Sequence, residues 1–291
     1  MRRRFREGGR RRIWALRQHQ YDLSTDAEPV RGLWSQAEAT YVTSFKKGGD
    51  PVLWGCDIEE IQPHFLIRDL SFANPKNQAL QSVAEITKSG YQRIMAPELL
   101  RRLHDATDAK DILRGGVSLK NNLLRTLEVE VDRLSNDTRL QASNRREALM
   151  KELFYFNYQK NPKGKVFARF GRNHLHRGLD RRGVSTLGNF IAELAVAQGL
   201  RTFNLAAFGG GGKIFLLDSL LDWDERKDDP AFEFLASVAR YPATLFDLRP
   251  IRQALHRIPE NQRSQVEASL VYWADSYDTI LCYREVTPLQ H

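Results

Sequence analysis

One short stretch of the sequence gathers residue types that can carry out acid–base chemistry. His174, His176, Arg177 and Asp180 all fall within the segment Gly171–Ser185. Histidine changes protonation near neutral pH, so His174 is the candidate general base, general acid or metal ligand. Arginine keeps its charge at any working pH, so Arg177 is the candidate for stabilising an oxyanion, with a surface salt bridge as its alternative role. His176 is separated from His174 by one residue and is expected to be solvated.

Two acidic residues, Asp57 and Glu59, form a second set of candidates. They stand at the end of Pro51–Ile58, a compact apolar run that is expected to be a buried strand. From the end of a strand they could project into the same cleft as His174 and orient its ring or accept its proton. The alternative is that they begin a helix, where the helix dipole favours acidic residues. The sequence leaves both roles open.

The elements around the histidine-bearing loop predict a βαβ unit. Lys165–Phe170 is a short apolar run that follows a turn sequence, so it is expected to be a strand. Thr186–Gln198 has helical apolar spacing, with Ser185 as its expected N-cap and Gly199 at its C-terminal end. Thr202–Phe208 is the second expected strand. The loop would then lie at the carboxyl end of a parallel strand, where open α/β sheets bind ligands.

Two glycine features bear on this site. Gly171 is expected to let the backbone turn sharply away from the strand. Gly209–Gly212 resembles an anion cradle, but it lacks the GKS/T of a P-loop and the spacing of GxGxxG. A flexible turn is therefore predicted there.

Residues 61–159 are expected to be helical, in roughly four helices that turn signals separate. The breaks are expected at Asn74-Pro75, Ala96-Pro97 and Gly115-Gly116, and Leu119–Leu134 carries an amphipathic stripe. Further strands are expected at Ile13–Leu16, Thr244–Leu248 and Thr279–Val286, and further helices at residues 20–50, 230–240, 251–255 and 262–273. This alternation favours an α/β fold with a mostly parallel central sheet, helices on both faces and an inserted helical region at about residues 61–160.

The charge of the chain is concentrated at its start. The formal net charge is +8, yet residues 1–17 contain eight arginines and one glutamate, and the other 274 residues contain 36 basic and 35 acidic side chains. Such an arm can bind phosphate backbones nonspecifically, but a disordered, solvated leader is favoured, so nucleic acid is not the expected partner. We expect residues 1–12 to be this leader and residues 13–291 to form a single α/β domain, with the helical region at 61–160 as a cap.

The expected compartment is cytoplasmic. No apolar run approaches the roughly 18–20 residues that cross a bilayer, and the arginines at the start are not followed by the apolar region of a signal peptide. The two cysteines, Cys56 and Cys282, lie in expected strands and are predicted to be buried free thiols. We expect a small-molecule substrate or ligand and no membrane partner.

The motifs resemble those of the Tiki / erythromycin-esterase-like / ChaN-like superfamily. Gly171-Arg172-Asn173-His174 is a GxxH, and the run FGRNHLHRG followed by LGNFIAELA is similar to the second signature of that superfamily. Trp54-Gly55-Cys56-Asp57-Ile58-Glu59 is similar to its WGxD strand end. Weaker likenesses lie at residues 146–158 and 277–288. The resemblance covers roughly residues 13–291 and is most specific at 165–195.

The resemblance implies an α/β fold whose cleft holds two histidine-bearing loops and acidic residues. It assigns His174 to the second histidine and places Asp57 and Arg177 at pocket-lining positions; a divalent metal or haem is implied by resemblance alone. The first histidine motif should precede the strand expected at Ile13–Leu16, but the first histidine is His19.

A truncated or catalytically impaired hydrolase, acting on an ester or lactone, is therefore the expected function. The alternative is a non-catalytic ligand-binding or interaction protein of the same fold, associated with haem or a metal.

Overall fold

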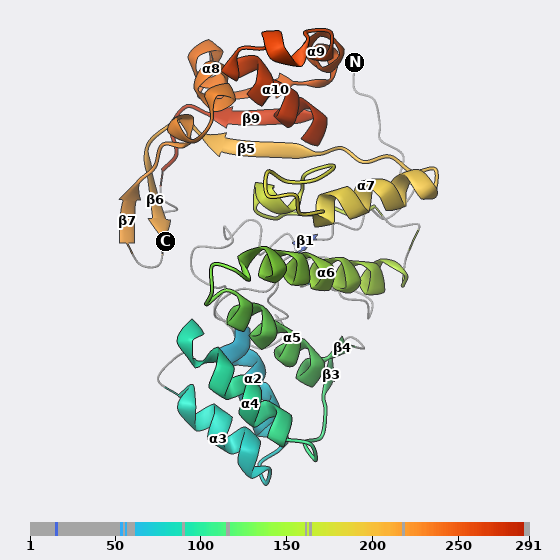
Figure 1. Cartoon of the computed structure of the whole chain (residues 1–291), viewed down its shortest axis with the longest axis vertical. Helices are drawn as coiled ribbons and strands as arrows, with labels where there is room; N and C mark the ends of the chain where they lie inside the picture. The colour runs from blue at the N-terminus through green and yellow to red at the C-terminus, as the bar shows by residue number, and fades with distance from the viewer. Residues whose placement is uncertain are drawn as a thin grey trace, which may run out of the picture. The chain divides into compact units, whose positions relative to one another are not determined.

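The structure is a computed structural model of the whole chain (Figure 1). The structure describes residues 15–16, 53–54, 56, 62–88, 91–114, 117–160, 162, 165–216 and 219–287. The chain forms two compact units: the first comprises residues 1–25 and 40–169, and the second comprises residues 26–39 and 170–291. Both helices and strands are present, in agreement with the expected α/β class. The expectation of a single domain over residues 13–291 stays a prediction.

Helices dominate the described part of the first unit, as the sequence predicts. They are α2 (Gln62–Ala73), α3 (Gln78–Ile86), α4 (Ala96–Asp105), α5 (Leu119–Asp132) and α6 (Arg139–Tyr158), with a 3₁₀ turn at Arg93–Met95. Asn74 follows the end of α2 and Pro97 lies in the first turn of α4, so two of the three expected breaks are confirmed. The third, Gly115-Gly116, lies outside the described residues. The separation of α5 from α6 was not predicted, because the polar turn between them contains neither glycine nor proline.

The core of the first unit lies between helices α2 to α5, which contact one another in the stack shown in Figure 1. Leu119, Leu123 and Leu127 recur every four residues along α5 and are at most 3% exposed. They pack with the buried side chains of the other three helices, among them Ile67, Leu80, Leu99 and Leu103. The amphipathic stripe expected over Leu119–Leu134 is thus confirmed for these three leucines, whereas Leu134 lies beyond the end of α5 and is 46% exposed.

Two short strand pairs complete the description of this unit. β1 (Ala15–Leu16) pairs in parallel with β2 (Leu53–Trp54), within the two stretches expected to be strands. β3 (Leu113–Arg114) and β4 (Val117–Ser118) form an antiparallel pair. The helix expected within residues 20–50 lies outside the described residues.

The strand expected at Lys165–Phe170 is not formed. The segment alternates between exposed and half-buried residues, which is the period of a strand, but no described strand pairs with it. The period records which side chains face outward, whereas a strand also requires a neighbour for its backbone hydrogen bonds. The predicted βαβ unit is therefore wrong in its first strand.

The second unit is built on a three-stranded sheet. β5 (Leu205–Gly209) pairs in parallel with β9 (Thr279–Tyr283), and β8 (Ala243–Asp247) pairs with the other edge of β9 in the antiparallel sense. All three strands overlap stretches that the sequence predicts, but the sheet they form is small and mixed, so the mostly parallel central sheet is not confirmed. β6 (Lys213–Leu216) and β7 (Ser219–Asp222) form an antiparallel hairpin.

Helices α8, α9 and α10 lie together on one side of this sheet (Figure 1). The described helices of the second unit are α7 (Leu187–Ala197), α8 (Pro230–Val238), α9 (Arg249–His256) and α10 (Gln265–Ser276), with 3₁₀ turns at Arg172–His174, Glu225–Asp228 and Glu260–Gln262. Gly199 follows α7 with φ of 66°, as expected of a C-terminal glycine. The N-cap of α7 is Thr186 and not Ser185, because the Thr186 side chain accepts from the Asn189 amide.

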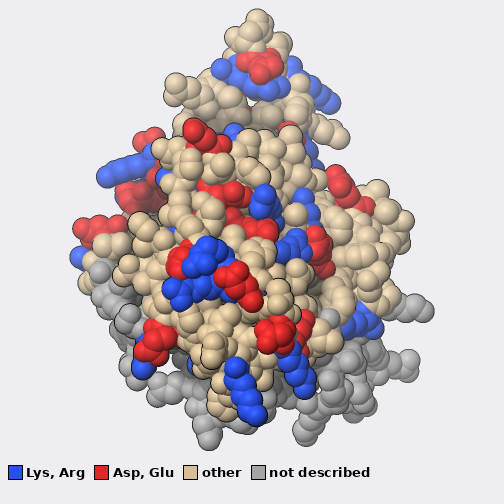
Figure 2. Space-filling model, turned by 60° about the horizontal axis from the view of Figure 1, so that its bottom comes forward, with Lys and Arg blue, Asp and Glu red and all other residues tan. Residues whose placement is uncertain are grey.

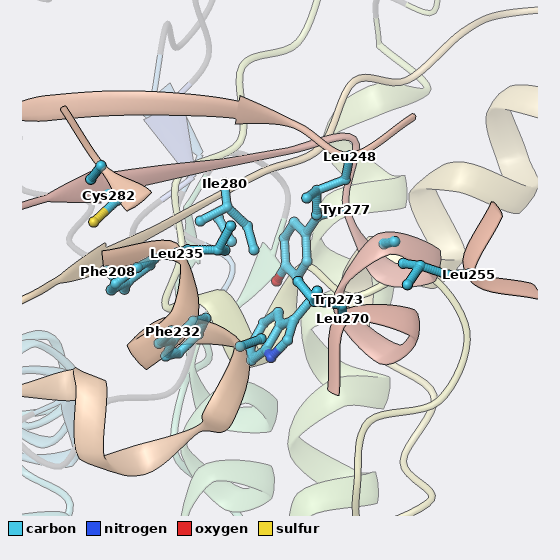
Figure 3. Close-up of a cluster of buried hydrophobic side chains, with 14 residues drawn as sticks. Phe208, Phe232, Leu235, Leu248, Leu255, Leu270, Trp273, Tyr277, Ile280 and Cys282 are labelled. Carbon is cyan, nitrogen blue, oxygen red and sulfur yellow. The ribbon is translucent and has the colours of Figure 1, made fainter. Parts of the chain in front are cut away.

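The core of the second unit fills the space between the sheet and helices α8 and α10 (Figure 3). Phe208 and Ile280 project from neighbouring strands, and Phe232 of α8 stacks on Phe208 with ring centroids 4.3 Å apart. Trp273 of α10 lies against Phe232 at 4.7 Å. Cys282 is buried in the same cluster, and both cysteines are free and buried, as predicted.

The described surface carries intermixed charges. Figure 2 shows basic and acidic side chains side by side on the face it presents, in keeping with the near-equal numbers of the two in residues 18–291. Surface pairs such as Arg101 with Glu98 and Lys88 with Glu85 account for part of this mixture. Within the described ranges, no helix combines the length and the apolar character that crossing a bilayer would need.

Candidate functional site

The candidate site is the loop from Phe170 to Thr186, which opens with the 3₁₀ turn Arg172–His174. Two backbone hydrogen bonds close this turn, from the His174 amide to the Gly171 carbonyl at 2.9 Å and from the Leu175 amide to the Arg172 carbonyl at 3.0 Å. Gly171 has φ of −54° and ψ of 137°, a conformation that any residue adopts. The expectation that Gly171 is needed for a sharp turn is therefore wrong.

His174 occupies the end of the turn, and its side chain is half-buried. Its ring meets the ring of Phe170 edge-on, with centroids 6.4 Å apart and planes inclined by 64°. The ring therefore rests on an apolar neighbour and is still partly accessible to solvent. A general base needs this combination, because it must be held in place and yet reach a water molecule.

His176 is buried, contrary to the prediction that it is solvated. It is 1% exposed and lies among the rings of Tyr272, Trp273 and Tyr277, at centroid distances of 5.2, 5.5 and 5.3 Å. The Tyr272 hydroxyl is 3.2 Å from its Nδ1. The 3₁₀ turn ends at His174, and the chain beyond it runs into the core with Leu175 packed there. Burial lowers the pKa of His176 to about 4, so its ring is neutral at pH 7.

Arg177 is held in an ion pair with Asp278, whose side chain is 9% exposed. Both arms of the guanidinium donate to this carboxylate, and one of these distances is 3.0 Å. The Asn204 amide donates to the same carboxylate at 2.8 Å. Burial acts to raise the pKa of Asp278, but the hydrogen bonds from Arg177 and Asn204 and the arginine charges outweigh it and lower the pKa. The salt bridge left open by the sequence is present, whereas the oxyanion role of Arg177 stays a prediction.

Two more arginines of the loop are paired with buried carboxylates. Arg172 donates to Glu225, which also accepts from the Gly209 amide at 2.6 Å. Arg181 donates to Asp229, which is 3% exposed and caps α8. Three ion pairs thus tie the loop to the rest of the second unit, and His174 lies between the first two of these arginines in the sequence.

Sequence reasoning missed the acidic partners of these arginines. Arg172, Arg177 and Arg181 are separated from them by 53, 101 and 48 residues. Only Asp229 carried a local signal, because an aspartate followed by proline is typical of the start of a helix. Asp57 and Glu59 lie outside the described residues, so their expected approach to His174 stays a prediction.

The glycine run after β5 is explained by packing. A Cβ atom on Gly209 would lie 2.8 Å from Val286 Cγ1, and one on Gly212 would lie 2.1 Å from the Val286 carbonyl oxygen. Gly212 also has φ of 116°, which side chains rarely allow. The run is a turn, as expected, and the lack of side chains on Gly209 and Gly212 lets Val286 pack closely against it.

The described residues provide no cluster suited to a metal. Among them, no three or more His, Cys, Asp and Glu side chains are grouped so that they could hold an ion. The divalent metal or haem implied by the family resemblance is therefore assigned no ligands here.

Comparison with known proteins finds similarity in structure but not in sequence. No protein-family model matches the chain, and no curated protein matches it. A mutant of the erythromycin esterase EreC in its open conformation is 11% identical with a TM-score of 0.52, covering 95% of this chain and 83% of EreC. A protein from Bacillus cereus gives the same identity and TM-score, covering 95% of this chain and 81% of its own.

A third solved structure is described as a succinoglycan biosynthesis protein. It is 13% identical with a TM-score of 0.50, and covers 94% of this chain and 79% of its own. At such low identities the likeness concerns the fold alone. The chain shares its fold with erythromycin esterase EreC and these two proteins, in agreement with the resemblance noted in its motifs.

Proposed function

We propose that this chain is an erythromycin-esterase-like hydrolase that cleaves an ester or lactone bond in a small molecule, with His174 as its general base. The observation that carries the proposal is the half-buried His174 ring, on a turn anchored by buried ion pairs, in a fold shared with EreC. Asp57 and Glu59 are proposed to orient this ring, the role expected from their position at the end of the apolar run Pro51–Ile58.

In the proposed reaction the imidazole of His174 takes a proton from water while the water oxygen attacks the acyl carbon. The tetrahedral intermediate then collapses, the ester C–O bond breaks, and the imidazolium returns the proton to the departing alkoxide. The products are a carboxylic acid and an alcohol, and no external oxidant or reductant is needed. We propose that Arg177 anchors the loop, because its guanidinium already forms an ion pair with Asp278.

The proposed activity is tested with the purified full chain on p-nitrophenyl esters and on a macrolide lactone. His174→Gln keeps a polar side chain but cannot act as a base, so kcat/KM should fall by about 10²-fold or more. His256→Gln is the matched control, because His256 is an exposed histidine paired with Asp275 on the surface. The control should retain the wild-type rate within about twofold.

Equal rates for wild type and His174→Gln would remove His174 from the mechanism. Saturable binding of a lactone by a wild-type chain that shows no turnover would instead support the alternative, a non-catalytic ligand-binding protein of this fold.

A further inference from the structure

We propose that Gly188, the second residue of α7, is a positioning residue that sets the orientation of the His174 ring. The proposal deepens the function proposed above and rests on it for its catalytic consequence. Nothing in the spacing of the sequence singles out Gly188, because its role comes from a contact between two backbones.

Gly188 allows α7 to approach the histidine loop closely. A Cβ atom built on Gly188 would lie 2.3 Å from the carbonyl carbon of Leu175, 2.4 Å from its oxygen and 2.5 Å from its Cα. Contacts this short do not occur in proteins, and backbone atoms cannot rotate away as a flexible side chain can. Leu175 directly follows His174, so the absence of a Cβ on Gly188 determines how closely α7 lies to the backbone next to the candidate base.

Leu175 cannot move away easily, because it is also held by the core. Its carbonyl oxygen accepts a hydrogen bond from Asn204 Nδ2 at 2.9 Å, and its side chain packs against the core of the second unit. The backbone of Leu175 is therefore confined between the first turn of α7 and Asn204.

The start of α7 also holds the residues that follow Leu175. Thr186 Oγ1 donates to the carbonyl of His176 at 2.7 Å and accepts from the Asn189 amide at 3.2 Å. Asn189 Oδ1 in turn accepts from the Gly178 amide at 2.7 Å. These two hydrogen bonds to His176 and Gly178, together with the contact of Gly188 with Leu175, link the first turn of α7 to the backbone after His174.

Alanine at position 188 would require Leu175 to shift by roughly 1 Å, and a displacement of that size at a catalytic group can cost about 10²-fold in rate. Gly188→Ala is thus expected to be harmful, although alanine is usually more favourable than glycine within a helix. The expected result for Gly188→Ala is therefore a fall in kcat of about 10²-fold with KM within about threefold, since the substrate contacts are retained.

The experiment compares Gly188→Ala with two further variants of the full chain. Gly199→Ala is the stability control, because Gly199 has φ of 66° and lies at the other end of α7, with open space around its Cβ position. Asn204→Ala releases the Leu175 carbonyl without introducing a clash, so it tests the same restraint if Gly188→Ala does not fold. Each variant is assayed for ester turnover and for the ring resonances of His174 in a histidine-labelled sample, assigned by their loss in His174→Gln.

Gly188→Ala and Asn204→Ala should shift the His174 ring resonances and lower kcat, whereas Gly199→Ala should leave both unchanged. Unaltered His174 resonances and an unaltered kcat in whichever of these two variants folds would overturn the inference. If the wild type has no esterase activity, the proposed function fails, but a shift of the His174 resonances in Gly188→Ala and not in Gly199→Ala would still support the positioning role.

Discussion

The helices of the first unit and the histidine loop of the second are held in place by different kinds of contact. Helices α2 to α5 pack through aliphatic side chains spaced along each helix, so local sequence determines which face is buried. The loop from Phe170 to Thr186 has little regular structure and is held by Arg172, Arg177 and Arg181, each paired with a carboxylate far away in the chain. The loop that carries the candidate base therefore depends on long-range polar contacts.

The largest expected effect comes from removing one of the buried carboxylates. Asp229→Ala leaves Arg181, Trp273 Nε1 and the Ala231 amide without their acceptor, and it removes the cap of α8. We expect a loss of about 4 kcal/mol in the free energy of unfolding, because a buried partner is left unpaired. Urea denaturation measures it, with Asp275→Ala in the exposed His256 pair as the control, expected to cost at most about 1 kcal/mol. Equal losses in the two variants would contradict the assigned role of Asp229.

A cavity in the first unit should have a somewhat smaller effect. Leu123 is fully buried on α5, so Leu123→Ala should lower the free energy of unfolding by about 3 kcal/mol. Leu140→Ala on α6 is the control, because Leu140 is 50% exposed. Hydrogen exchange sharpens the comparison: faster exchange confined to α2–α5 would show that the units open separately, whereas equal acceleration in α8 and α10 would show that they unfold as one.

The burial of His176 predicts a pH-dependent stability. Its pKa is about 4 in the folded chain, below the usual value near 6.5, so the unfolded chain binds the proton more tightly. Stability should be full above about pH 6.5 and should fall by on the order of 2–3 kcal/mol as the pH drops to 4.

His176→Gln keeps a polar group near Tyr272 but removes this titration, so the stability of the variant should depend less on pH between 6.5 and 4. Urea denaturation across that range measures the difference. An unchanged pH dependence would show that other groups cause it.

The smallest predicted effect concerns the start of α10, about two turns before the residues of this helix that contact His176. Ser264 and Glu267 form a capping box at the start of α10, with the Glu267 amide 3.2 Å from Ser264 Oγ. Ser264→Ala should lower the free energy of unfolding by about 1 kcal/mol and leave ester turnover unchanged. A loss of turnover in this variant would show that activity follows overall stability and not the geometry of the loop.

The helical region and the strands of the second unit could be predicted from the sequence because their signals are local. Leu119, Leu123 and Leu127 mark the buried face of α5, and Gly199 marks the end of α7. Each signal lies within a few residues of the structure that it specifies, so no knowledge of the fold is needed.

The polar contacts of the site could not be predicted in this way. The burial of His176 depends on three aromatic rings about 100 residues further along the chain, and the role of Gly188 depends on the backbone of Leu175. At Lys165–Phe170 a local signal led to a wrong prediction. The alternation of exposed and half-buried side chains is present, but no strand among the described residues pairs with the segment. The sequence identified the histidine loop but not the contacts that hold it.

The most direct test of the central claim is the ratio of kcat/KM for an aryl ester between wild type and His174→Gln, measured beside His256→Gln. A general base on this turn predicts a ratio of about 10² or more for His174→Gln and close to one for the control. A ratio near one for both variants, with measurable wild-type turnover, would contradict the account.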